Sequence, residues 1–141
     1  MTRKHSAFTL VEILIVVIIL GILAAIVIPQ FTEASNDARE SAMKSDLQTV
    51  RSQLELYKVQ HLDSYPDDFA KLTSKTNADG TTTNGTLGPY LTKMPTNGYN
   101  DKATVEIEAG TDGRGDNSHG WHFDSTGGTF APDDNATHAA W

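Results

Sequence analysis

The sequence predicts an α+β fold, in which a long N-terminal α-helix packs on a small C-terminal antiparallel β-sheet head. Three observations support this prediction: a continuous apolar run near the N-terminus, an apolar stripe with helical spacing after it, and short alternating segments in a loop-rich remainder. The chain has 141 residues, which is the length of about one domain.

The composition excludes several classes of protein. Eleven Lys and Arg residues against eighteen Asp and Glu residues give a net charge of −7. A chain this acidic is not expected to hold nucleic acid or anionic lipid by electrostatic attraction. It contains no cysteine, which excludes a disulfide framework, a thiolate zinc site and a cysteine nucleophile.

The apolar run predicts a transmembrane helix. Residues 13–28 include no polar side chain. A helix over residues 8–31 would be about 24 residues and roughly 36 Å long, enough to cross a hydrocarbon core of about 30 Å. Arg3 and Lys4 precede it, so the N-terminus is expected in the cytoplasm and the head outside it. A secretory signal peptide or a plain membrane anchor would share these features.

One carboxylate interrupts the apolar run. Glu12 lies between Val11 and Ile13, where burial of a charge in lipid costs at least about 2.5 kcal/mol. No Lys or Arg occurs between Lys4 and Arg39, so the chain offers no nearby cation downstream. A free N-terminal amine, produced by cleavage just upstream, would supply the right charge at the right depth.

The segment Ala7-Phe8-Thr9-Leu10-Val11-Glu12 resembles the processing motif of type IV pilins and type II secretion pseudopilins. The resemblance implies a leader over residues 1–7, cleavage between Ala7 and Phe8 by a prepilin peptidase/methyltransferase, and N-methylation of Phe8. It also implies that Glu12 acts in filament assembly. Ala7 departs from the family pattern, in which glycine usually precedes the cut.

The same resemblance implies a helix hinge at Gly21 and Pro29, between which the helix loosens in assembled filaments. The chemistry of proline agrees, because Pro29 has no N–H to donate to the Ala25 carbonyl and its ring kinks a helix. The alternative is that Pro29 only marks the point where the helix leaves the membrane.

An amphipathic helix is expected over residues 32–65. Its apolar side chains recur at spacings of four and three, and charged residues occupy the other faces. The stripe comprises Met43, Leu47, Val50, Leu54 and Tyr57. We expect it to pack on the head of the same chain, with a partner helix as the alternative. Pro66 should end the helix, because the residue before a proline is pushed out of helical geometry.

Residues 66–141 are expected to form the head. A short helix over residues 67–72 and a surface loop over 73–88 precede three strands at 104–108, 121–124 and 129–131. The turn at 125–128 makes the last two strands a hairpin, and we expect all three to be antiparallel. This order of a long helix and a small sheet resembles the pseudopilin fold. About 76 residues without a disulfide form a marginal core, so packing on the helix should contribute.

Metal binding has two candidate residue sets. Type IV pilins often carry a C-terminal disulfide, whereas major pseudopilins commonly bind calcium there, so the resemblance implies a calcium site. Oxygen donors that suit calcium are Asp112, Asp116, Asn117, Asp124, Asp133 and Asp134. The alternative is that they are solvent-facing turn residues. His119, His122 and His138 would need further ligands to hold zinc, and an early strand start would place the first two on opposite faces, so no zinc site is expected.

The function predicted from these features is structural. We expect the major pseudopilin of a type II protein secretion system, assembling through its N-terminal helix into a periplasmic pseudopilus. The alternatives are a type IV pilin of a surface pilus for adhesion or motility, and a membrane-tethered binding or enzymatic domain. No phosphate-binding loop or nucleophile elbow is present, and no cofactor is required.

The expected partners follow from the resemblance. They are other copies of this chain, other pilins or pseudopilins, the prepilin peptidase/methyltransferase and an inner-membrane assembly platform, and nucleic acid is not among them. Before assembly the chain is expected in the inner membrane as a single-pass protein, with a cytoplasmic N-terminus and a periplasmic head.

Overall fold

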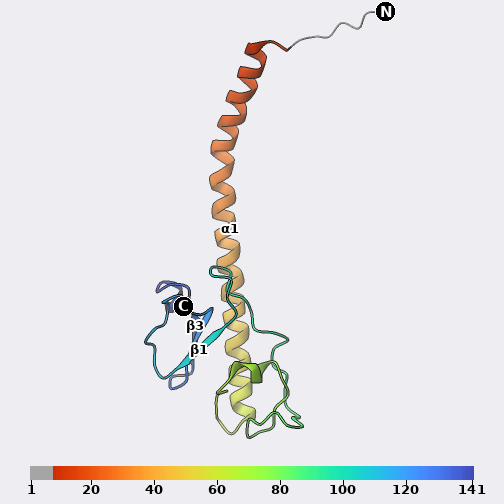
Figure 1. Ribbon diagram of the computed structural model, residues 1–141, viewed down its shortest axis with the longest axis vertical. Helices are drawn as coiled ribbons and strands as arrows, with labels where there is room; N and C mark the ends of the chain where they lie inside the picture. The colour runs from red at the N-terminus through yellow and green to blue at the C-terminus, as the bar shows by residue number, and fades with distance from the viewer. Residues whose placement is uncertain (1–7) are drawn as a thin grey trace, which may run out of the picture. The chain divides into compact units, whose positions relative to one another are not determined.

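The computed structural model describes residues 8–141, so the predicted leader, with Ala7, lies outside the described residues. The elements in chain order are α1 (Leu10–Gln60), η1 (Phe69–Leu72), β1 (Val105–Glu108), β2 (Trp121–Asp124), β3 (Thr129–Pro132) and η2 (His138–Ala140) (Figure 1). The chain divides into two compact units, the first ending at Ala38 and the second comprising Arg39–Trp141. The predicted α+β class is confirmed.

The first unit contains the apolar part of α1. This helix is the one helix of the described chain that is long and apolar enough to cross a membrane. Its apolar side chains are exposed along the whole segment, for example Leu10 at 82% and Ile28 at 64%. The helix continues through Pro29, where the Thr32 hydroxyl donates to the Ile28 carbonyl at 3.2 Å. A hinge at Gly21 and Pro29 stays a prediction.

In the second unit the apolar stripe of α1 is buried. Its five residues, Met43, Leu47, Val50, Leu54 and Tyr57, are 0–2% exposed. They share one core cluster with side chains of the head, among them Phe69, Leu72, Trp121, Phe123 and Phe130. The expectation that the stripe packs on the head of its own chain is therefore confirmed.

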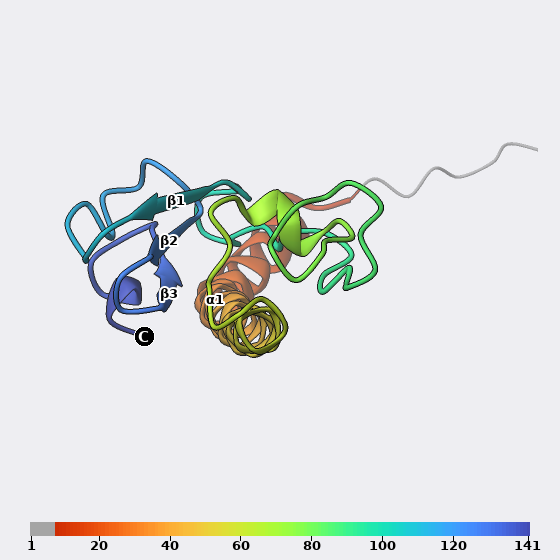
Figure 2. The same cartoon turned by 90° about the horizontal axis from the view of Figure 1, so that it is seen from below.

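A polar contact fixes the position of β3 on α1. The Arg51 guanidinium donates from Nε and Nη2 to the Phe130 carbonyl, at 2.9 and 2.7 Å. Figure 2, which looks along α1, shows β3 as the strand beside this helix. Because a guanidinium presents its donors in a rigid fork, this bond sets the orientation of the strand as well as its distance.

The helix ends at Gln60, five residues before the predicted end at Tyr65. Leu62 and Asp63 have positive φ angles of 55° and 62°, and the Asp63 N–H donates to the Lys58 carbonyl at 3.1 Å. Left-handed residues after the last turn are a common way to cap a helix. The chain has thus left the helix before Pro66 can act on it.

The sheet has the order β1-β2-β3 and differs from the prediction in one strand. β2 and β3 are antiparallel, with Phe123 opposite Phe130, as expected. β1 instead pairs with β2 in parallel, with Val105 opposite Trp121, so the prediction of an all-antiparallel sheet was wrong. A parallel pair needs a connection of about a dozen residues or more, and residues 109–120, called the crossover below, provide it.

The central strand β2 is buried on both faces. Trp121 and Phe123 belong to the core cluster on the α1 side. His122 points to the opposite face, because side chains alternate along a strand, and yet it is 0% exposed. Its Nε2 lies 3.1 Å from the Gly110 carbonyl, so the crossover covers this outer face.

Asp124 connects the crossover to the β2–β3 turn. Its Oδ1 accepts hydrogen bonds from the N–H groups of Gly110 at 2.8 Å and Thr126 at 2.9 Å. The backbone amides of Gly127, Gly110 and Thr126 hold the pKa of the Asp124 carboxyl below its usual value. The charged form is therefore the one that stabilises this junction.

Replacing Asp124 should destabilise the head in a pH-dependent way. The folded-state pKa lies below the unfolded value of about 3.9, so the stabilisation is present at neutral pH. It is lost as the pH falls through the folded-state pKa. Thermal unfolding of the full chain in detergent at pH 7 should show Tm several degrees lower for Asp124→Ala.

Asp124→Asn is the matched control, because its amide oxygen can still accept from the same backbone N–H groups without a charge. Its Tm should fall between those of the wild type and Asp124→Ala at pH 7. The difference between wild type and Asp124→Asn should narrow at pH 3. Equal Tm values for all three proteins at pH 7 would contradict the proposed role.

Candidate functional site

The first candidate site is the start of α1. Thr9 and Glu12 form a capping box, in which the Glu12 N–H donates to the Thr9 hydroxyl at 3.3 Å. In return, the Glu12 carboxylate accepts from the Thr9 N–H at 3.5 Å. Phe8 precedes this cap and is 74% exposed. The structure thus gives Glu12 a role within its own helix that the sequence prediction did not include.

An apolar groove lies along the same end of α1. It has a volume of about 460 Å³ and is lined by Phe8, Thr9, Leu10, Ile13, Leu14 and Val17. The carboxylate of Glu12 and a concave apolar surface therefore occur within the first turns of one helix. This combination suits contact with another apolar helix better than it suits a soluble ligand.

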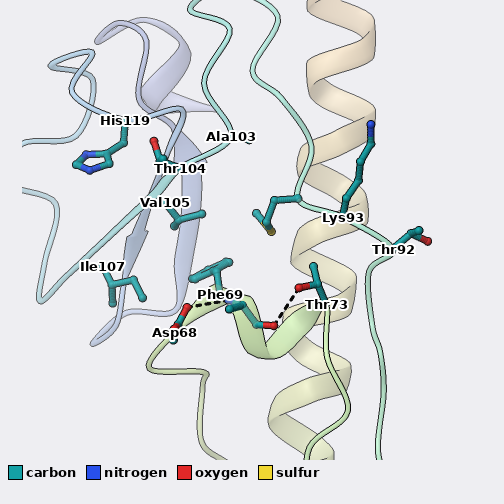
Figure 3. Close-up of a pocket in the computed structure, with 12 residues that line it drawn as sticks. Asp68, Phe69, Thr73, Thr92, Lys93, Ala103, Thr104, Val105, Ile107 and His119 are labelled. Atoms are coloured by element: carbon teal, nitrogen blue, oxygen red, sulfur yellow. Dashed lines mark hydrogen bonds between the residues drawn. The ribbon is translucent and has the colours of Figure 1, made fainter. Parts of the chain in front are cut away.

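The head contains a second groove, of about 570 Å³, between η1 and β1 (Figure 3). Two of its polar residues form hydrogen bonds with the nearby backbone. Asp68 accepts from the Ala70 N–H at 2.8 Å, and the Thr73 hydroxyl donates to the Ala70 carbonyl at 3.0 Å. The His119 ring is turned away from Phe69 and the groove centre. Among the described residues that line it, no set of acid, base and nucleophile converges.

Asp133 holds the crossover in place. Its side chain is 0% exposed and accepts from the N–H groups of Gly115 at 2.7 Å and His119 at 2.8 Å. Two other predicted calcium ligands lie nearby: the Asn117 N–H donates to the Asp133 carbonyl, and Asp116 accepts from the Ser118 N–H. Three of the six predicted ligands thus meet at the crossover, but as hydrogen-bond partners.

The other three predicted calcium ligands lie elsewhere. Asp134 accepts from the Asn97 amide and pairs with His138, Asp124 lies at the β2–β3 turn, and Asp112 is exposed. Calcium requires six to eight oxygens around one point. The six residues do not form such an oxygen cage in this structure, and calcium binding stays a prediction.

A mixed acidic and histidine cluster lies on the outer face of the sheet. Glu106, His119 and Asp133 each offer one ligand atom, and these atoms lie within 4.8 Å of one another. His119 and His122 both approach Glu106, with Nδ1 atoms 3.8 and 3.6 Å from its two carboxylate oxygens. β2 begins at Trp121, so the early strand start that would place the two histidines on opposite faces does not occur. Sequence reasoning missed Glu106 because only the parallel register of β1 and β2 places it beside His122.

Comparison with known families identifies two regions of the chain. The model described as prokaryotic N-terminal methylation motif matches residues 2–28. The model described as type II secretion system (T2SS), protein G, matches residues 30–119, which is more than half of the chain.

Several relatives carry the name type II secretion system core protein G. The protein of Pseudomonas aeruginosa is 35% identical over 96 residues, covering 66% of this chain and 67% of that protein. The protein of Vibrio cholerae is 31% identical over 126 residues, covering 79% of this chain and 84% of that protein. The Escherichia coli protein is 31% identical over 98 residues, covering 70% of this chain and 63% of that protein.

No solved structure matches the chain. The two family matches and the relatives nevertheless agree with one another, since they combine the N-terminal methylation motif with type II secretion system protein G. The chain belongs to the family of type II secretion system protein G, the major pseudopilins, which are structural proteins and not enzymes.

Proposed function

We propose that the chain, once residues 1–7 are removed, assembles through the apolar helix of residues 8–31 into a periplasmic pseudopilus. The observation that carries this proposal is the exposed apolar part of α1, with one carboxylate near its start. Burying a large apolar side chain is worth about 1.5–3 kcal/mol, so this surface must be covered by lipid or by other helices. The membrane covers it before assembly, and neighbouring subunits cover it in the filament.

Apolar contact alone cannot set the register of such a filament. Lipid tails are as apolar as leucine, so moving the helix from lipid to other helices gains little from the hydrophobic effect. A charge pair in a low-dielectric environment is stronger than in water and has a defined position. We assign this pair to the Glu12 carboxylate and the N-methylated amine of Phe8 in a neighbouring subunit.

The proposal divides the chain by role. Residues 1–7 are the leader, 8–31 the membrane and filament-core helix, 32–65 the amphipathic helix and 66–141 the head. The partners are other copies of this chain and other pseudopilins, the prepilin peptidase/methyltransferase that cuts after Ala7, and an inner-membrane assembly platform. The family membership supports partners within a secretion system.

The two roles of Glu12 can be separated by substitution. Glu12→Gln keeps an oxygen that can cap the helix but removes the charge, whereas Thr9→Ala removes the hydroxyl of the capping box and keeps the charge. If the charge pair drives assembly, Glu12→Gln should reduce filament yield by at least about tenfold. That loss corresponds to about 1.4 kcal/mol per contact. Thr9→Ala should assemble at near wild-type yield.

Filament yield is measured by crosslinking of the chain in the envelope, with membrane insertion checked by fractionation. Glu33→Gln is the matched control, because it removes a carboxylate from the same helix beyond the apolar run. Normal filament yield from Glu12→Gln would refute the charge-pair role. So would a reduction of filament yield in Thr9→Ala as large as that in Glu12→Gln.

Processing should produce a chain that begins at Phe8. Mass spectrometry of the chain from envelopes should show a single N-methyl group on Phe8. Replacement of the small Ala7 by lysine should leave the leader attached, while Ala7→Gly should be processed at least as well as the wild type. A wild-type chain that retains residues 1–7 in assembled material would contradict the proposed cleavage.

The location of the filament distinguishes a pseudopilus from a surface pilus. At native expression, shearing of intact cells should release little of the chain, which should remain with the envelope. Deletion of its gene should leave exported proteins of the secretion system in the periplasm, and the wild-type gene should restore their release. Abundant sheared fibres with undisturbed secretion would instead indicate a surface pilus.

A further inference from the structure

Two hydrogen-bond acceptors face each other on the outer side of the sheet. The Nε2 of His122 contacts the Gly110 carbonyl at 3.1 Å, and since a carbonyl only accepts, this contact assigns the proton to Nε2. The Nδ1 of the same ring lies 3.6 Å from Glu106 Oε2. Both atoms are buried and lack a hydrogen-bond partner among residues 8–141.

This arrangement leaves a place for a proton or a metal ion between two acceptors. A neutral imidazole presents a lone pair at Nδ1, and an ionised carboxylate presents another at Oε2, so the two atoms repel each other in a buried place. His122 is 0% exposed, and water has little access to separate them. A proton on either atom, or a metal ion beside the pair, removes the repulsion.

Further ligands surround the same carboxylate. His119 Nδ1 lies 3.8 Å from Glu106 Oε1, and the ligand atoms of Glu106, His119 and Asp133 all lie within 4.8 Å of one another. Zinc bonds of about 2.1 Å in a tetrahedron place ligand atoms about 3.4 Å apart. The observed separations therefore need only small side-chain movements to close around one ion.

The surrounding contacts are those that support metal ligands. The Nε2–H of His122 donates to a backbone carbonyl, which is the usual way to orient a ligating imidazole. The Asp133 carboxylate is held by the N–H groups of Gly115 and His119. The side chains of Glu106 and His119 are 22% and 36% exposed, so an ion can reach them from solvent.

We propose that Glu106, His119 and Asp133 bind one divalent ion of the zinc class, with His122 as a further donor beside Glu106. Imidazole nitrogen favours zinc over calcium, which takes oxygen ligands, and two carboxylates neutralise the charge of the ion. Glu106 comes from β1 and His122 from β2. His119 comes from the crossover, and Asp133 directly follows β3. The ion would thus cross-link the crossover to the sheet in a chain without cysteine.

Metal titration of the mature chain tests this site directly. The chain is purified from envelopes in detergent, treated with EDTA and dialysed, and then titrated with Zn²⁺ or with Ca²⁺ in a calorimeter. We expect one Zn²⁺ to bind per chain and to raise Tm, because an ion that binds only the folded state stabilises it. Ca²⁺ at the same concentration should not compete with Zn²⁺ for this site.

Variants locate the site. Glu106→Gln and His119→Ala should each weaken Zn²⁺ binding by at least about tenfold. Glu108→Gln is the matched control, because Glu108 is the next outward residue of the same strand and is exposed. Its affinity for Zn²⁺ should equal that of the wild type, and circular dichroism shows whether each variant is folded.

The wild-type protein alone can overturn the proposal. Absence of Zn²⁺ binding, or binding of Ca²⁺ at this site in place of Zn²⁺, would refute it whether or not the variants fold. So would an equal loss of affinity in Glu108→Gln.

Discussion

The head depends on the apolar stripe that α1 contributes to its core. Its three strands have four residues each, and sheets this small need a further apolar layer to be stable. Met43, Leu47, Val50, Leu54 and Tyr57 provide that layer against the aromatic side chains of η1, β2 and β3. The chain has no cysteine, so this packing and the Arg51–Phe130 contact stabilise the head in place of the disulfides found in many small exported domains.

The same packing determines what lies on the other side of the sheet. Because Trp121 and Phe123 face the stripe, the alternation of the strand turns His122 outward. The parallel register then places Glu106 beside it, and the crossover that makes the parallel pair possible closes over both. A buried polar cluster on the outer face is thus a consequence of one connection, residues 109–120.

Local patterns in the sequence predicted the local structure well. The helical stripe, the short helix after Asp68 and the β2–β3 hairpin all depend on spacing and turn residues, which act over a few positions. The parallel pairing of β1 could not be predicted in this way, because it depends on where a twelve-residue crossover (109–120) folds. The alternation of polar and apolar side chains over residues 104–108 is compatible with parallel or antiparallel pairing of this strand.

The candidate site residues also differ in whether local sequence or long-range contacts determine their environment. Phe8 and Glu12, which stay predicted assembly residues, were proposed from a motif of adjacent residues, which needs no tertiary information. Glu106 was missed, since its significance arises only from neighbours that lie more than ten residues away in the chain. Of the aspartates proposed as calcium ligands or solvent-facing turn residues, Asp112 and Asp116 are exposed, whereas Asp124 ends β2 and Asp133 is buried. Their partners, mostly backbone N–H groups, could not be assigned without the fold.

The capping box is compatible with the charge pair proposed for Glu12, because it involves the same carboxylate only within its own helix. A negative charge is most favourable at the start of a helix, where unpaired N–H groups and the helix dipole attract it. Glu12 occupies that position and already accepts from the Thr9 N–H. A carboxylate has two oxygens and several lone pairs, so a cap within one helix leaves capacity for an amine from another. The cap and the proposed charge pair therefore both require a carboxylate at the first turn of α1, and the proposed pair would offset the cost of placing that charge in lipid.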